Sequence, residues 1–107
     1  MTSQALKPNN CYQASLRFMM KHTGAGCVLV HGIVDALGNT GHAWVETSDR
    51  KTVLEVCRHP LIGQRREIPA AEYYRAVGAK NCQTFDLKAA CEMVISTGLW
   101  GPWEPRL

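Results

Sequence analysis

Residues 42–58 read HAWVETSDRKTVLEVCR, and this stretch decides the fold. A polar turn, Ser48-Asp49-Arg50-Lys51, separates two segments rich in β-branched and apolar residues, as in a β-hairpin. If the turn is centred between Asp49 and Arg50, Trp44 lies opposite Glu55. The hairpin therefore predicts which side chains share a face.

The two faces of the predicted hairpin differ in chemistry. The apolar face holds Ala43, Val45, Leu54 and Val56, and the polar face holds His42, Trp44, Glu46, Glu55 and Cys57. A shift by one residue would mix these two sets, so the division supports this register. On the polar face, His42 and Glu55 are diagonal neighbours, about 7 Å apart between backbone positions, which lets the carboxylate orient the imidazole.

A cysteine at the start of a predicted helix completes this constellation. The segment Asn9-Asn10-Cys11 precedes apolar residues at helical spacing and supplies a candidate N-cap. A cysteine attacks carbonyl groups as a thiolate, and both a helix N-terminus and a nearby imidazole lower the pKa of a thiol. We therefore predict a triad of Cys11, His42 and Glu55. Cys57 is the alternative nucleophile, because the register places it beside His42.

The order of these residues resembles that of papain-like and transglutaminase-like cysteine enzymes, in which Cys, His and Asp or Asn follow one another. The phrase His42-Ala43-Trp44-Val45-Glu46 looks like the histidine motif of small bacterial or phage-type members, among them the leader-peptide-cleaving proteins of lasso peptide biosynthesis. The resemblance covers residues 10–55. It implies a minimal papain-like core, Cys11 as nucleophile, His42 as base and Glu55 where the family usually has Asp.

Two positions depart from the family pattern. Glu55 is one methylene longer than Asp, which changes its reach. Papain-like peptidases place a glutamine shortly before the nucleophile to donate to the oxyanion, but Ala5 stands there. The backbone N–H of Cys11 can donate instead, and the side-chain alternatives are Gln4, Asn9 and Asn10. The candidates for substrate contact are Tyr12, Gln13 and Trp44, with Trp44 as a wall of the site.

The order of apolar and turn-forming segments along the chain predicts an α+β fold, with the Cys11 helix packed on a small antiparallel sheet and with C-terminal helices. The predicted elements are a helix over 11–22, strands over 27–34, 42–47 and 52–58, and helices over 69–78 and 86–97. The nearly continuous apolar run in 27–34 indicates a central strand covered on both faces. We expect His31, within that run, to be a core histidine with satisfied hydrogen bonds, and the two tail tryptophans to pack on the domain.

Composition limits the class of protein. The 107 residues are 46% hydrophobic and 20% charged, which predicts one domain over residues 1–107. The net charge of +3 comes from scattered basic residues, so we expect no nucleic-acid partner. Without a signal-peptide pattern or an apolar span, we expect a cytoplasmic protein that does not bind membranes.

Cysteine usage favours reduced thiols. The number of cysteines is odd and their spacing is wide, which argues against a disulfide framework. No pair of cysteines or histidines has the spacing of zinc ligands, so we expect neither a metal nor another cofactor. Cys27, Cys82 and Cys91 read as core or edge thiols.

Two functions remain open from the sequence. The first is a cysteine-dependent hydrolase or acyltransferase that acts on amide bonds of a peptide or protein through a thioester, as a peptidase, deamidase or isopeptidase. The second is a catalytically inactive protein-binding module on the same fold. Because the domain is small, we expect a protein partner to complete a substrate groove.

Overall fold

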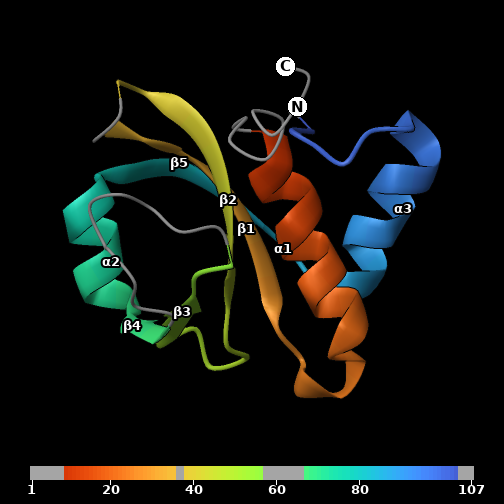
Figure 1. Ribbon diagram of the computed structural model, residues 1–107, viewed down its shortest axis with the longest axis horizontal. Coiled ribbons are helices and arrows are strands. Elements are labelled where there is room, and N and C mark those ends of the chain that lie inside the picture. The colour runs from red at the N-terminus through yellow and green to blue at the C-terminus, as the bar shows by residue number, and fades with distance from the viewer. Residues whose placement is uncertain (1–8, 36–37, 57–66, 104–107) are drawn as a thin grey trace, which may run out of the picture.

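A five-stranded antiparallel sheet lies between two helical layers in the computed structural model, which describes residues 9–35, 38–56 and 67–103 (Figure 1). The strands lie in the order β4-β3-β2-β1-β5. In chain order the elements are α1 (Asn9–Lys21), the 3₁₀ helix η2 (Thr23–Ala25), β1 (Val28–Val34), β2 (Thr40–Glu46), β3 (Thr52–Leu54), β4 (Glu67–Pro69), α2 (Ala70–Val77), β5 (Ala79–Phe85) and α3 (Leu87–Thr97). The predicted α+β class, with a Cys11 helix on an antiparallel sheet, is confirmed.

The sheet carries a separate hydrophobic core on each face. Helices α1 and α3 cover one face, and α2 covers the other (Figure 1). The first core contains Leu16, Met19, Leu29, Val45, Ala90 and Trp103. The second contains Val30, Val34, Trp44, Val53, Ile68, Tyr73 and Val77. Strand β1 contributes to both cores from the middle of the sheet, as its apolar run predicts.

Strands β2 and β3 pair in the predicted register. Val45 faces Leu54, and Glu46 faces Val53. The turn closes where the sequence predicts, because Thr47 N–H donates to the carbonyl of Thr52 at 2.9 Å. Strand β3 is shorter than predicted, since it ends at Leu54. Residues 57 and 58, and with them the predicted position of Cys57 beside His42, lie outside the described residues.

Strands β4 and β5 are not predicted from the sequence. Strand β4 has only three residues. Strand β5 pairs with β1, but its register shifts between His31 and Ile33, and Asn81 adopts a left-handed φ of 52°. This irregularity is typical of a β-bulge. It breaks the two-residue alternation by which a strand is recognised in a sequence.

The helix ends follow local rules, with one correction. Helices α2 and α3 are followed by the capping residues Gly78 and Gly98, both with positive φ, as is common at the C-terminus of a helix. The side chain of Asp86 caps α3 by accepting a hydrogen bond from the N–H of Ala89 at 2.8 Å. Helix α1 begins at Asn9, so Asn9 and Asn10 lie inside its first turn rather than before it. None of the helices in the described ranges is long and apolar enough to cross a membrane.

His31 is a core histidine, but its hydrogen bonds are not satisfied as predicted. Its ring lies among those of Tyr12, Trp103 and Phe85, with centroid distances of 4.7, 4.8 and 5.2 Å. Neither ring nitrogen has a hydrogen-bond partner among the described residues. Burial lowers the pKa of His31 to about 4. The predicted packing of the tail on the domain is confirmed, since Trp103 is buried here.

We expect His31 to make the fold acid-sensitive. Between its pKa of about 4 in the folded protein and the ordinary value of 6.5, the unfolded chain takes up a proton that the folded protein does not. The free energy of unfolding should therefore fall by about 3 kcal/mol as the pH drops through this window, and level off below it. Replacing His31→Leu should remove this component, as measured by urea unfolding across the window.

The matched control for this experiment is His22→Leu. His22 is exposed at the end of α1, so its removal should leave the difference in stability between the two ends of the pH window unchanged. If wild type and His31→Leu lose stability equally on acidification, the buried imidazole is not the cause.

Candidate functional site

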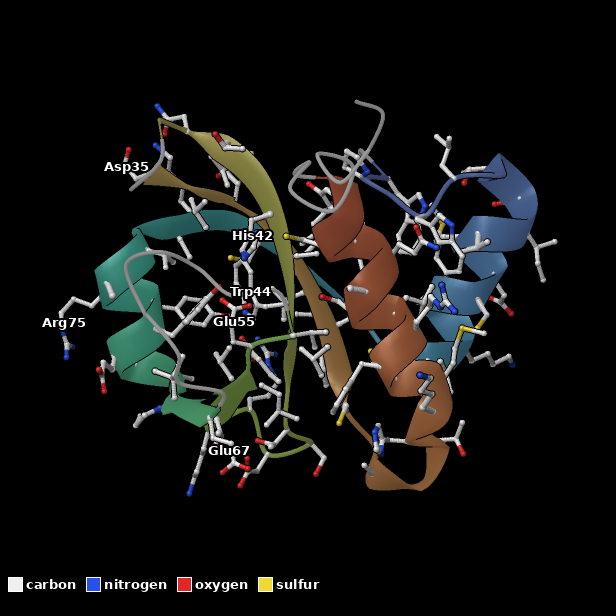
Figure 2. The ribbon with its side chains drawn as sticks, in the orientation of Figure 1. Asp35, His42, Trp44, Glu55, Glu67 and Arg75 are labelled. Carbon is white, nitrogen blue, oxygen red and sulfur yellow. The ribbon has the colours of Figure 1, made fainter. Side chains whose placement is uncertain are left out.

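His42 and Glu55 lie together on the face of the sheet that α2 covers, as the hairpin register predicts. Figure 2 shows both side chains, with Trp44, on the side of β2 that faces α2. The distance between His42 Nε2 and Glu55 Oε2 is 3.9 Å, and the two residues are 8% and 2% exposed. This distance is longer than a hydrogen bond but within the range of an ion pair once the imidazole is protonated.

Tyr73 of α2 also contacts Glu55. Its hydroxyl donates a hydrogen bond to Glu55 Oε2 at 2.9 Å, the same oxygen that faces His42. Tyr73 is fully buried, so this bond is shielded from water. The helix that carries Tyr73 is predicted from the sequence, but its contact with Glu55 is not.

Trp44 forms a wall beside His42 and is itself held by a buried carboxylate. The two rings lie 5.8 Å apart, and Trp44 Nε1 donates to Glu46 Oε2 at 3.0 Å. Glu46 also accepts hydrogen bonds from the hydroxyl of Tyr74 and from Nε of Arg50. Burial, followed by the hydrogen bond to Glu46, raises the pKa of Tyr74 to about 12. Glu46 is therefore an anchor for Trp44 rather than a group available to substrate.

The helix that carries Cys11 packs on the opposite face of the sheet from His42. Ser15 Oγ of α1 contacts the carbonyl oxygen of Ala43 at 3.4 Å. Cys11 precedes Ser15 by one helical turn and therefore lies on the same side of α1, near the start of β2. It is partly exposed and lies in the first turn of the helix, where backbone N–H groups favour an anion.

Among the described residues, β3 pairs with β2 only at Val45 and Glu46, so His42 lies beyond the paired part of β2. The structure thus brings His42 and Glu55 together directly, whereas Cys11 approaches from the other layer of the fold.

A second thiol, Cys82, lies on the same face as His42. Gly32 is the cross-strand partner of His42, and a Cβ atom added at Gly32 would be 2.8 Å from Cys82 Sγ and 3.1 Å from Trp44 Cη2. The sulfur therefore occupies the space above Gly32, beside the indole. Burial, followed by the negative charge of Glu46, raises the pKa of this thiol. The sequence offers no sign of this placement, because it follows from the bulge in β5.

The other predicted site residues have varied environments. Tyr12 is buried against His31 rather than exposed to substrate, and Gln13 is partly exposed on α1. Asn10 lies in the first turn of α1. Gln4 and Cys57 lie outside the described residues. Within the described parts of the chain, no group of three histidine, cysteine, aspartate or glutamate side chains is placed to hold a metal ion.

Comparison with known proteins identifies no relative. No protein-family model, curated protein or solved structure matches this chain. The resemblance to papain-like and transglutaminase-like enzymes stays a prediction that depends on Cys11, His42 and Glu55.

We expect Glu46→Gln to destabilise the protein by about 2–4 kcal/mol, because one amide oxygen replaces two carboxylate oxygens that serve three donors. Urea unfolding, together with near-ultraviolet circular dichroism of the aromatic side chains, would measure the effect. The matched control is Glu67→Gln on β4, since Glu67 is exposed and its loss should change stability by less than about 0.5 kcal/mol. Equal effects of the two substitutions would contradict the role of Glu46 as an anchor.

Proposed function

We propose that this protein is a cysteine-dependent hydrolase or acyltransferase that acts on amide bonds of a peptide or protein. The observation that supports the proposal is the buried contact between His42 and Glu55, at 3.9 Å. A carboxylate beside an imidazole orients the ring and stabilises its protonated form, which is the task of the third member of a catalytic triad. Papain-like and transglutaminase-like enzymes use such a pair with a thiol.

The proposed reaction proceeds by acyl transfer. His42 takes the proton of the thiol as the sulfur attacks the carbonyl carbon, which gives a tetrahedral oxyanion. The C–N bond then breaks, and the amine leaves with the proton from His42, so that a thioester remains. Water or a second amine, deprotonated by His42, attacks the thioester and releases the thiol. The acceptor in this last step decides between hydrolysis and transfer.

Cys11 is the proposed nucleophile. Its place in the first turn of α1 favours a thiolate, and its partial exposure leaves it open to substrate. Cys82 is the second candidate because it shares a face with His42, but its raised pKa and its packing against Trp44 make it a poorer nucleophile. We propose a cytoplasmic location, where thiols are kept reduced.

The packing of α1 favours one alternative, a catalytically inactive module that binds a protein. Helix α1 packs on one face of the sheet, and alternation along β2 places His42 on the other face, with Trp44. If Cys11 and His42 do not cooperate, the fold serves recognition, and a protein partner would complete the surface. The two functions differ in the reactivity expected of the thiol.

Alkylation by iodoacetamide, mapped by mass spectrometry, tests the proposal. We expect Cys11 to react well below pH 8.5, about the midpoint of an ordinary thiol, and faster than Cys27 and Cys91. His42→Ala should slow this reaction by about tenfold or more, while the control His22→Ala should not.

Three other outcomes would change the conclusion. If Cys82 is the thiol whose alkylation rate depends on His42, then Cys82 is the nucleophile and the proposed reaction class stays the same. The same holds for Cys57. If no cysteine depends on His42, the enzyme proposal fails and the binding module remains.

A further inference from the structure

Tyr73 meets the proposed triad at a single oxygen atom. Glu55 Oε2 accepts the hydrogen bond of the Tyr73 hydroxyl at 2.9 Å and lies 3.9 Å from His42 Nε2. The other oxygen, Oε1, has no hydrogen-bond partner among the described residues. The direction of the carboxylate toward His42 therefore depends on the bond from Tyr73.

Glu55 needs such a support because the sheet does not fix it. Strand β3 ends at Leu54, so Glu55 follows the last residue of the regular ladder. Its side chain has more rotatable bonds than that of aspartate, and a buried carboxylate can turn away from an imidazole at little cost unless a donor holds it. The required donor must come from a rigid element.

Helix α2 supplies that rigid element. It begins after Pro69 and ends at Gly78, and both Tyr73 and Val77 pack into the second core with no exposed surface. The Tyr73 ring also contacts Trp44, at 5.3 Å between centroids. The hydroxyl is thus held on two sides, by its own helix and by the wall of the site. We infer that Tyr73 is a positioning residue, which keeps Glu55 aimed at His42. This inference rests on the proposed function.

The neighbouring tyrosine shows that the contact is specific to position 73. Tyr74 also contacts Trp44, at 5.7 Å, but its hydroxyl donates to Glu46 instead of Glu55. The two adjacent tyrosines therefore hold two different buried carboxylates. Tyr73→Phe and Tyr74→Phe remove the same atom from the same helix, and only the first should affect His42.

The test measures the rate at which iodoacetamide alkylates the cysteine whose reactivity depends on His42, between about pH 6 and 9. We expect Tyr73→Phe to lower this rate about threefold to tenfold, the net value of one ordinary hydrogen bond, and Tyr74→Phe to lower it less than about twofold. In a Glu55→Gln background, Tyr73→Phe should add almost no further loss, because the group that it positions has already been changed.

A second readout does not require a reactive thiol. The ring signals of His42 in proton NMR should shift in Tyr73→Phe and in Glu55→Gln, and stay near their wild-type positions in Tyr74→Phe. Circular dichroism checks that each variant is folded.

The outcomes separate the enzyme proposal from the positioning role of Tyr73. If His42 controls a thiol but Tyr73→Phe behaves like Tyr74→Phe, or if its loss is fully additive with Glu55→Gln, Tyr73 is only a packing residue and the enzyme proposal stands. If no thiol depends on His42 while the ring signals shift as expected, the enzyme proposal fails and Tyr73 still orients Glu55 toward His42. Unchanged ring signals in Tyr73→Phe would overturn the positioning role in either case.

Discussion

Strand β2 is buried on both faces, and the alternation of its side chains constrains everything that packs against it. Ala43 and Val45 point to α1 and α3, whereas His42, Trp44 and Glu46 point to α2, because successive residues of a strand face opposite ways. A buried polar group is costly unless it has a partner. The polar side chains of β2 all lie on one face, so helix α2 and the turn that carries Arg50 can supply the partners that they need.

The two buried carboxylates on this face, Glu46 and Glu55, have different hydrogen-bond and charge partners. Glu46 accepts hydrogen bonds from Arg50, Tyr74 and Trp44, so a cation and two neutral donors compensate its charge. Glu55 has a neutral donor, Tyr73, and an imidazole that is charged only after it gains a proton. Glu46 therefore has partners that neutralise its charge, whereas the partners of Glu55 within the described residues include no permanent cation. Under the proposed function, this arrangement suits a carboxylate that faces the imidazole of His42.

The sequence allowed the hairpin to be predicted in detail because its two faces differ so clearly. The apolar set Ala43, Val45, Leu54 and Val56 permits one register, and the observed pairs Val45 with Leu54 and Glu46 with Val53 follow it. The helix ends at Gly78 and Gly98 are equally local, since a positive φ at these positions suits glycine.

Features that depend on tertiary structure could not be predicted in this way. Strand β5 contains a bulge at Asn81, so its sequence pattern is neither helical nor alternating. Because the strand could not be predicted, the position of Cys82 on it could not be predicted either. The face on which α1 packs also has no local signal, because both faces of β1 are apolar. Hydrogen bonds such as that from Tyr73 to Glu55 join residues far apart in the sequence. They depend on the docking of α2, which no periodicity encodes.

The presence of glutamate at position 55, where the family resemblance implies aspartate, has a physical reason in this arrangement. The residue lies just beyond the end of β3, and its carboxylate must reach across to His42 on β2 while accepting the hydroxyl of Tyr73 from α2. The side chain of aspartate is one methylene shorter, so from the same backbone position its carboxylate would lie nearer the strand and farther from one of these two groups. The longer side chain spans the distance at the cost of more rotational freedom. The buried tyrosine hydroxyl offsets that cost, so glutamate at 55 and tyrosine at 73 are best understood as one unit.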